Sequence, residues 1–215
     1  MQWQIDEDGY WAGTLGKILM GCVCGPEDLP PGLEIRELKQ VHGNRILDDA
    51  SYQSQDQEGD GLVSDLPGCC LVIRTADCVP VHLTDGERIM MVHAGWRGTK
   101  GGIVKKAAAH LDPSRATAVI GPAICGDHYE VGPDLYQAWQ SEEPTLSAFL
   151  KPARTAPDKR LFDLRGFIRA QLHSLGFGEA RVTVIPRCTF AGPLPSYRRQ
   201  GEAAARIYNY ICRQA

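Results

Sequence analysis

"RTADCVPVHLTDGERIMMVHAGWRGT", residues 74–99, is the stretch that predicts the centre of the fold. Its two apolar runs flank Asp85-Gly86, a dipeptide that is typical of the tight turn between two antiparallel strands. Pairing outward from a two-residue loop sets Cys78 opposite His93. The Cβ atoms of such facing residues are roughly 4.5–5.5 Å apart. The hairpin therefore predicts either two ligands of one metal ion or a thiolate beside its base.

Pro80 conflicts with regular pairing in this register. It would face Met91 in a hydrogen-bonded position, where proline has no N–H to donate, so a bulge or an early strand end is expected. A one-residue shift there would turn one side chain to the other face of the sheet. The alternative is that Cys78 is a core thiol and His93 a strand-end histidine, because free cysteine is among the most buried residue types. Their pairing across one hairpin favours a functional role.

The segment after His93, "AGWRGTKGG", leads into a predicted helix that begins near Gly102. Glycines ahead of a helix let backbone N–H groups approach an anion, and Arg97 adds a planar donor for phosphate or carboxylate. Trp96 is, by residue type, more often a packing residue. The same pattern also occurs in plain tight turns, so both interpretations stay open here.

The rest of the chain predicts an α+β fold. Strand-like runs rich in Val and Ile cover residues 68–75, 116–121 and 180–188, and residues 47–61 are a loop candidate. Strands in hairpins as well as between helices indicate mixed or antiparallel sheets with flanking helices. Composition and length are those of one globular domain, taken as residues 1–215.

Three helices are predicted, over residues 103–111, 163–176 and 202–215. Asp163 can cap the start of the second helix and Gly176 its end. The first two have a regular apolar face, formed by Ile103, Val104, Ala107, Ala108 and Leu111 and by Leu164, Phe167, Ile168, Leu172 and Leu175.

Charge and composition exclude several classes of partner. The net charge of -3 gives no electrostatic case for nucleic acid or an anionic membrane. No apolar stretch has the length of a membrane span, and the acidic start lacks the features of a secretory signal, so a cytoplasmic location is expected. In that compartment the eight cysteines should be reduced. Five are expected to be structural: Cys22, Cys24, Cys69, Cys70 and Cys212.

Several segments, in order along the chain, carry a family resemblance: "QVHGN", "GDGLVSDLPG", "RTADCVPV", "VHAGWRGT", "IGPAICGDHYEVG" and "SYRRQG". From about Gln40 almost to the C-terminus the chain closely resembles the polyphenol oxidase (laccase-like) or purine nucleoside phosphorylase family, also called the peptidoglycan editing factor family. The combination of "TADC" with "HAGWRG" is highly specific. The resemblance implies a layered α-β-β-α fold similar to that of cysteine-dependent toxin deamidases.

The resemblance implies a metal site formed by His42, Cys78 and His93, which are also the implied catalytic residues. The hairpin selects two of these three independently, whereas His42 comes from the resemblance alone. One thiolate and two imidazoles suit Zn²⁺ with a fourth position open, where the metal can lower the pKa of bound water to near 7. Cu²⁺ is the alternative cofactor, because it binds such donors more tightly.

The implied activity is phosphorolysis of adenosine, inosine and methylthioadenosine to the free base and the sugar 1-phosphate, with adenosine deamination beside it. The expected partners are a small nucleoside and phosphate, for a monomer or a homodimer. Plausible substrate contacts are Asn44, Arg97, Gly98, Tyr197 and Arg198. For Arg198-Arg199 a solvated surface pair is an equal alternative.

Some residues depart from the family pattern or stay unassigned. The family usually has Gly-Pro where this chain has Cys125-Gly126, and His128 in the same loop is expected at the surface. His82 lies roughly 13 Å along the strand from Cys78, too far to share one metal. Asp60 and Asp77 are next to the motifs, but acidic residues are common in turns.

Three alternatives compete with the phosphorylase. In a Cys–His hydrolase or amidase that edits peptidoglycan precursors, Cys78 is the nucleophile, His93 its base, and His42 is dispensable. A copper-dependent polyphenol oxidase would turn over phenols only after copper loading. A non-enzymatic binding module leaves three converging ligand-type residues unexplained.

Overall fold

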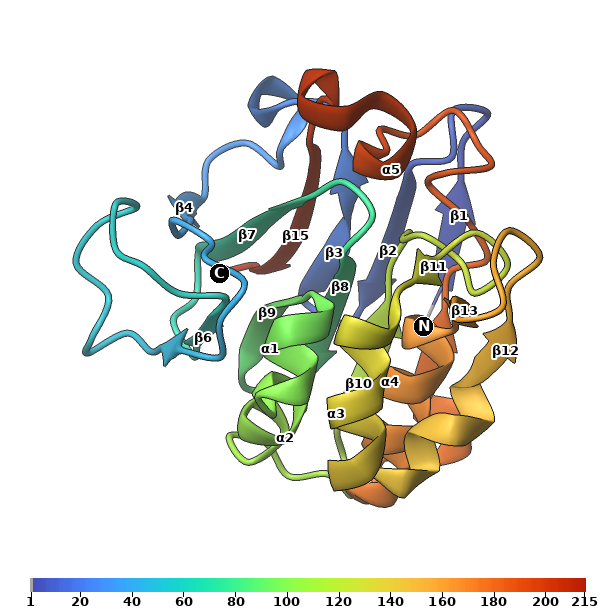
Figure 1. The fold of residues 1–215 in the computed structure, drawn as a ribbon. Helices are drawn as coiled ribbons and strands as arrows, with labels where there is room; N and C mark the ends of the chain where they lie inside the picture. Colours follow the sequence, from blue (N-terminus) through green and yellow to red (C-terminus); the bar gives the residue numbers. More distant parts are fainter. Residues whose placement is uncertain (1) are drawn as a thin grey trace.

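The computed structural model describes residues 2–215, and across them three β-sheets form the framework (Figure 1). The first sheet has the order β1 (Gln2–Ile5), β2 (Trp11–Leu15), β3 (Ile18–Val23), β15 (Ile207–Arg213), β7 (Cys69–Thr75), β4 (Glu34–Arg36). The second has the order β14 (Val182–Val184), β10 (Thr117–Ile120), β8 (Val79–Thr84), β9 (Ile89–Ala94), β6 (Gly61–Ser64), β5 (Ile46–Leu47). The third, smaller sheet has the order β11 (Glu130–Val131), β13 (Arg160–Phe162), β12 (Leu150–Pro152).

The α-helices are α1 (Trp96–Lys100), α2 (Ile103–Ala108), α3 (Pro133–Glu142), α4 (Leu164–Ser174) and α5 (Tyr197–Gln200). Short 3₁₀ helices cover Pro26–Asp28, Pro144–Phe149, Glu179–Arg181 and Gly201–Ala203. In the part of the chain that is described, no helix combines the length and the apolar character needed to cross a membrane.

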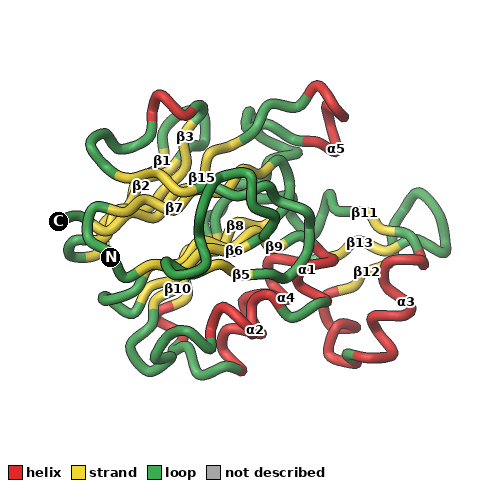
Figure 2. Tube along the Cα trace, turned by 90° about the vertical axis from the view of Figure 1, so that its left-hand side faces the viewer, coloured by secondary structure: helices red, strands yellow, loops and turns green. Residues whose placement is uncertain are grey.

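Strand β9 shows why the central apolar runs do not alternate with polar residues. Ile89 and Met91 face a core shared with the first sheet, whereas Met90 and Val92 face a core shared with the helices. A strand that is covered on both faces needs apolar residues at every position. Figure 2 shows the two large sheets stacked, with α2 and α4 on the far side of the second sheet.

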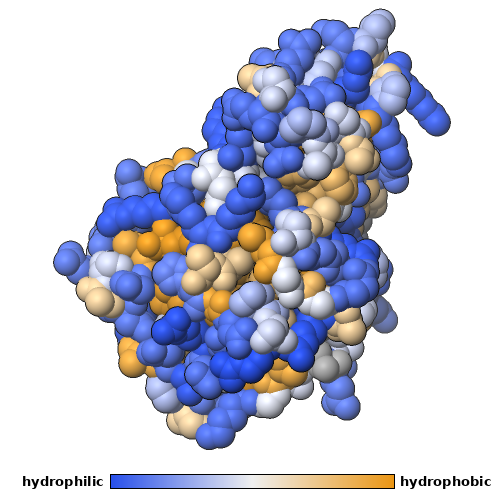
Figure 3. Space-filling model, turned by 90° about the horizontal axis from the view of Figure 1, so that it is seen from below, coloured by the Kyte–Doolittle hydropathy of each residue, from blue (hydrophilic) through white to orange (hydrophobic). Residues whose placement is uncertain are grey.

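The predicted α+β class with mixed sheets is confirmed, because both large sheets combine parallel and antiparallel pairs. The layers over residues 2–215 follow the order helix, sheet, sheet. The outer face of the first sheet carries a small apolar cluster, which includes Leu29 and Tyr210, in place of a packed helix. The similarity to toxin deamidases stays a prediction. Seen from the lower ends of the helices, the surface is mostly hydrophilic, with smaller apolar areas (Figure 3).

The two amphipathic helices are confirmed. The predicted core face of α2 is buried. Helix α4 is capped as predicted, because the Asp163 carboxylate accepts a hydrogen bond from the Gly166 amide in its first turn. Gly176, with φ +96°, follows the end of α4 as predicted.

The predicted hairpin forms, but its register is shifted by two residues. Thr84 pairs with Ile89 and Pro80 with His93, so the loop is Asp85–Arg88 and not Asp85-Gly86 alone. The Asp85 carboxylate accepts from the amides of Glu87 and Arg88, which closes the longer turn. A shift of two residues keeps every side chain on its face, so Cys78 and His93 still share one side of the sheet.

The predicted helix over residues 202–215 is wrong. Residues Ile207–Arg213 form β15, which lies between β3 and β7 in the middle of the first sheet. Local propensity favours a helix, but a position between two partner strands satisfies the backbone on both sides.

The expectation that every cysteine is reduced is also wrong. Cys70 and Cys212 are directly paired on β7 and β15, and they are joined as a disulfide. Cys22 and Cys69 are buried free thiols, whereas Cys24 is exposed.

Candidate active site

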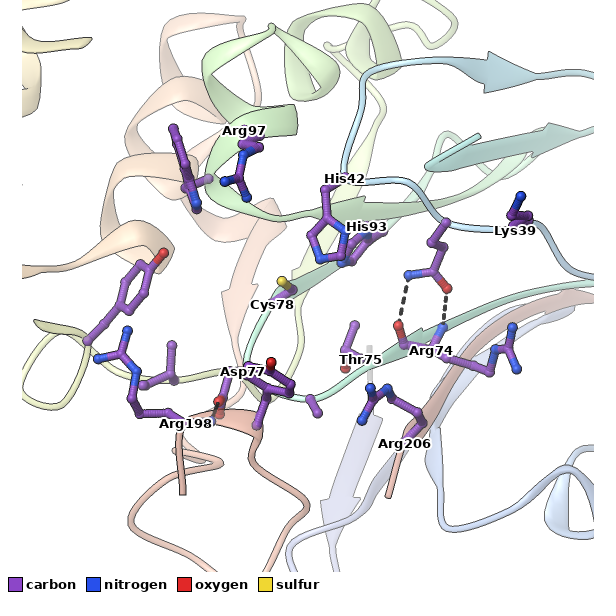
Figure 4. Close-up of a pocket in the computed structure, with 16 residues that line it drawn as sticks. Lys39, His42, Arg74, Thr75, Asp77, Cys78, His93, Arg97, Arg198 and Arg206 are labelled. Atoms are coloured by element: carbon purple, nitrogen blue, oxygen red, sulfur yellow. Dashed lines mark hydrogen bonds between the residues drawn. The ribbon is translucent and has the colours of Figure 1, made fainter. Parts of the chain in front are cut away.

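A pocket of about 690 Å³ opens beside the start of β8. Its walls come from the loop around His42, the β7–β8 connection, the start of α1, and α5 (Figure 4). The full lining is Lys39, Gln40, His42, Arg74, Thr75, Ala76, Asp77, Cys78, His93, Trp96, Arg97, Ile124, Tyr129, Tyr197, Arg198 and Arg206. Segments from both halves of the sequence therefore build one cavity.

Three metal-ligand side chains meet in this pocket. The ligand atoms of His42, Cys78 and His93 all lie within 4.8 Å of one another. Cys78 directly precedes β8, His93 is on β9, and His42 is on the loop before β5. The two imidazole rings meet edge to face, with centroids 4.8 Å apart (Figure 4). The structure thus brings together the two residues that the hairpin selects and the third from the family resemblance.

Asp60 positions both histidines. Its side chain is fully buried, and it accepts from the Nδ1 of His93 at 2.7 Å and from the amides of Val41, His42 and Gly43 at 3.3, 2.9 and 2.7 Å. When the imidazole is neutral, donation from Nδ1 leaves the Nε2 of His93 with its lone pair. One carboxylate therefore sets the orientation of His93 and holds the loop that carries His42.

The loop of His42 is also attached to the first sheet. The side-chain amide of Gln40 donates to the Arg74 carbonyl at 2.8 Å, and its oxygen accepts from the Arg74 amide at 2.7 Å (Figure 4). Gly98 permits a close approach from the other side, because a Cβ on Gly98 would collide with the Gly43 carbonyl oxygen. The position of His42 thus depends on long-range backbone packing.

Strained backbone lies at the site. Within residues 2–215 the non-glycine residues with positive φ are His42, at 60°, and Asp77, at 87°. The Asp77 carboxylate accepts from the Thr189 and Ser196 hydroxyls at 2.5 and 3.1 Å and from the Arg198 amide at 2.6 Å. Such strain persists only where surrounding contacts over-determine it, and it is concentrated at functional sites.

The pKa values of Cys78 and His93 are shifted in opposite directions. Burial by itself would raise the pKa of Cys78, but the charge of His93 and hydrogen bonds from both histidines lower it to about 6. Burial by itself would lower the pKa of His93, but the Cys78 thiolate and the Asp60 carboxylate raise it to about 9. Burial would likewise raise the pKa of Asp60, yet the hydrogen bond from His93 holds it below the ordinary value. Without a metal, the chain therefore favours a thiolate–imidazolium pair at neutral pH.

The charged lining of the pocket is mainly basic. It consists of Lys39, Arg74, Arg97, Arg198 and Arg206, together with Asp77, whose carboxylate is already hydrogen-bonded within the protein. This arrangement suits an anionic ligand.

Two arginines of the lining lie over aromatic rings. The guanidinium of Arg97 is 4.5 Å from the centre of the Trp96 ring, and that of Arg198 is 5.4 Å from the Tyr129 ring. The pocket therefore presents flat apolar surfaces beside cationic groups.

The predicted substrate contacts separate into two sets. Arg97, Tyr197 and Arg198 line the pocket, whereas Asn44 and Gly98 lie outside the lining. Asn44 donates to the Gly101 carbonyl and Gly98 packs under the loop of His42.

Of the neighbouring arginine pair, Arg199 is engaged within the protein. Its guanidinium donates to the carbonyls of Thr189, Phe190, Gly192 and Leu194. It therefore fixes the loop that follows β14.

Two histidines outside the pocket differ in how well the sequence predicts them. His82 is buried between the sheets, with its ring nitrogens 3.2 Å from the carbonyls of Val119 and Gly21, as expected of a structural residue. His128, expected at the surface, is half-buried against Cys125 and Phe190. The signal that sequence reasoning missed is the Cys-x-x-His spacing of residues 125–128.

Comparison with known proteins agrees with this architecture. Residues 29–214 match the family described as multi-copper polyphenol oxidoreductase laccase. A purine nucleoside phosphorylase of Deinococcus radiodurans is 34% identical over 185 residues, which cover 83% of this chain and 70% of that protein. Adenosine deaminase RL5, from an unknown prokaryotic organism, is 32% identical over 179 residues, covering 79% and 68%. A crystal structure of a DUF152 protein of Neisseria meningitidis is 25% identical with a TM-score of 0.83, covering 96% of this chain and 99% of that one.

Proposed function

This chain belongs to the multi-copper polyphenol oxidoreductase laccase family, and on that basis we propose that it is a metal-dependent purine nucleoside phosphorylase with an accompanying adenosine deaminase activity. The observation that carries the proposal is the convergence of His42, Cys78 and His93 in a pocket whose lining is mainly basic. The names of the relatives, a phosphorylase and a deaminase, support the same substrate class.

The donor set fits a Zn²⁺ ion. One thiolate and two imidazoles are ordinary Zn²⁺ donors, and three protein ligands leave a position for substrate or water. The hydrogen bond from His93 to Asp60 is the kind of support that orients a ligating imidazole. When bound, the ion would supply a Lewis acid that stabilises developing negative charge. Cu²⁺ is the alternative, because these donors also bind it.

The residues of the pocket would bind and orient both substrates. In phosphorolysis a phosphate oxygen forms a bond to the anomeric carbon, and the bond to the purine nitrogen breaks with its electron pair going to the base. Arg97 and Arg198, the two arginines over aromatic rings, are placed to hold the phosphate, and Trp96 and Tyr129 to contact the flat base. Holding the two reactants in line supplies much of such an acceleration.

We further propose that residues 1–215 act as one catalytic unit. The pocket joins residues 39–42 to residues 197–206, so its walls need segments that are far apart in the sequence. The cytoplasmic location and the monomeric or homodimeric state stay predictions.

The test is product analysis with adenosine, in the presence and absence of inorganic phosphate. Phosphate-dependent release of adenine and ribose 1-phosphate is expected, with inosine as the product of deamination. His42→Ala should abolish both activities, whereas His110→Ala, which also removes an imidazole but lies outside the pocket, should leave them unchanged. Full activity of His42→Ala, or adenine release that is independent of phosphate, would overturn the proposal.

A second candidate rests on the contact between Cys78, His93 and Asp60. A low-pKa thiolate beside an imidazolium that is held by a carboxylate is also the arrangement of a cysteine hydrolase. In that case metal-free protein would cleave an amide of a peptidoglycan precursor, alkylation of Cys78 would stop it, and His42→Ala would retain activity. The polyphenol oxidase named by the family description would instead require copper and a phenol substrate.

A further inference from the structure

A second group of metal-ligand side chains lies outside the pocket. The ligand atoms of Cys125, His128 and Cys188 are all within 4.8 Å of one another, and none of the three residues lines the pocket. The Nδ1 of His128 is 3.0 Å from the Cys125 sulfur and 3.7 Å from the Cys188 sulfur. Two sulfurs and one ring nitrogen therefore surround a common point.

The sheet brings the two cysteines together across 63 residues of chain. Strands β10 and β14 are parallel neighbours, and the segments that follow them leave the sheet on the same edge. A single bridge between Ala123 and Cys188 continues this pairing beyond the strands. Cys188 therefore reaches the level of Cys125 because of the parallel register.

A tight turn then adds the histidine. The amides of His128 and Tyr129 both donate to the Cys125 carbonyl at 3.0 Å, so the chain turns back over Cys125. The Phe190 ring packs against the His128 ring with centroids 5.0 Å apart. Within residues 2–215 the structure gives the His128 ring nitrogens no hydrogen-bond partner besides the two sulfurs. The imidazole is thus held in place with a ring nitrogen directed at both thiols.

The Cys188 sulfur accepts a hydrogen bond from the backbone. The Cys125 amide donates to it at 3.3 Å. Amide donors favour the thiolate, which is the form that binds a metal.

We propose that Cys125, His128 and Cys188 form a second metal site, which binds Zn²⁺ independently of the ion at His42, Cys78 and His93. Two thiolates and one imidazole are the donors of structural zinc sites, and thiolates select Zn²⁺ over Mg²⁺ or Ca²⁺. A water molecule would complete the four positions, because all three side chains are half-exposed. The proposal goes beyond the proposed function and does not rest on it.

The site would fix one wall of the pocket. Thr189, directly after Cys188, donates to the Asp77 carboxylate, and Asp77 precedes Cys78. Ile124, directly before Cys125, lines the pocket. An ion that joins Cys125 to Cys188 would therefore fix the positions of Ile124 and Thr189 relative to each other. It would position the pocket wall without contacting the substrate.

The experiment is a metal count on the full chain, purified under reducing conditions with Zn²⁺ in the medium. We expect about two ions per wild-type chain and about one in Cys188→Ser and in His128→Ala. His42→Ala should also lose one ion, and the double variant His42→Ala/His128→Ala should lose both. Cys24→Ser, which removes an exposed thiol elsewhere, should keep two. His128→Ala covers the case in which Cys188→Ser does not fold, because the His128 ring has no role in a strand pairing.

Replacement of zinc by Co²⁺ identifies which site is filled. Charge-transfer absorption from thiolate to Co²⁺ grows with the number of sulfur ligands. It should therefore be stronger in His42→Ala, which keeps the two-thiolate site, than in His128→Ala, which keeps the one-thiolate site. A wild-type count of one ion that is unchanged in both Cys188→Ser and His128→Ala overturns the second site. A Cys125–Cys188 disulfide in the reduced preparation overturns it as well. If the wild-type chain binds two ions but shows no activity with adenosine and phosphate, only the proposed function is overturned.

Discussion

The two Cys–His clusters use the same residue types in different surroundings. At His42, Cys78 and His93, a fully buried carboxylate receives the hydrogen bond of one imidazole, and the cluster opens into a basic pocket. At Cys125, His128 and Cys188, a backbone amide donates to one sulfur and the cluster lies outside the pocket. The groups behind the ligands, more than the ligands themselves, would therefore separate the proposed site for chemistry from the proposed site for structure.

The pKa values differ between Cys78 and Cys125, whereas at Cys188 burial would raise the pKa but the hydrogen bond with Cys125 lowers it. Burial would raise the pKa of Cys78, but His93 lowers it to about 6, whereas burial and the neighbouring Cys188 raise the pKa of Cys125. A reactive thiolate is therefore expected in the first cluster in the absence of a metal. In the second cluster, the Cys125 thiol is favoured in its neutral form until an ion displaces the proton.

The greatest loss of activity is expected when sulfur is exchanged for oxygen in the first cluster. Cys78→Ser should lower kcat/KM for adenosine phosphorolysis by about 100-fold or more, because several kcal/mol of Lewis-acid stabilisation depend on the bound ion. Cys125→Ser, the matched change in the second cluster, should lower it by less than about tenfold. Steady-state kinetics of the two variants measure this, and equal losses would contradict the assigned difference.

The second-largest effect is expected for Asp60→Asn. The amide keeps the shape of the side chain, but it cannot supply the negative charge that holds His93, so metal affinity or activity should fall by about 10–100-fold. Competition with a chelating dye gives the affinity. Asp127→Asn, a carboxylate beside the second cluster, is the control and should change neither. Wild-type affinity in Asp60→Asn would show that the carboxylate serves packing alone.

Gly98→Ala tests the packing beneath His42. The new Cβ would collide with the Gly43 carbonyl oxygen, so the loop must move, at a cost of about 1–3 kcal/mol in the free energy of unfolding. Gly178→Ala adds the same methyl group in open space and should cost less. Urea unfolding measures both variants. The metal count should drop at the first cluster only, and an unchanged stability of Gly98→Ala would disprove the tight contact.

The smallest difference between the two clusters is expected in the alkylation rates of Cys78 and Cys125 in metal-free protein. At pH 7 most of Cys78 is thiolate, and its labelling rate should fall about tenfold per pH unit below pH 6, where protonation removes the nucleophile. At pH 7 it should react faster than Cys125, because a larger fraction of Cys78 is thiolate. The factor should be only about severalfold, because a low-pKa thiolate is a weaker nucleophile. Peptide mapping after timed labelling follows each cysteine. Labelling of Cys78 with a midpoint near pH 9 would contradict the ion pair with His93.

Local patterns in the sequence predicted much of the fold. The hairpin, the strands around it and the two amphipathic helices are encoded by apolar periodicity and by turn residues close in the chain. The register of the hairpin differs by two residues from the prediction, because the Asp85 side chain closes a longer loop than its dipeptide suggests. The last strand has the local composition of a helix, and its pairing with β3 and β7 is not a local property.

Two buried histidines show where local patterns end. His82 and His93 lie on adjacent strands of the same hairpin, and both are almost fully buried. Burial without an acidic partner lowers the pKa of His82 to about 4, whereas at His93 the effect of burial is outweighed by Cys78 and Asp60, which raise the pKa to about 9. The two strands alone do not distinguish these environments, because Asp60 and Gly21 arrive from other sheet positions.

The residues along the chain were enough to identify the donors Cys78 and His93, their common face on a hairpin, and a resemblance that added His42. The folded arrangement was needed to place Asp60 behind His93, to form the opposite wall from Asp77 and Arg198, and to bring Cys125 to Cys188. The cause is separation along the chain. Periodicity and turn chemistry act over a few residues, whereas these contacts depend on how parallel and antiparallel strands align segments that are tens of residues apart.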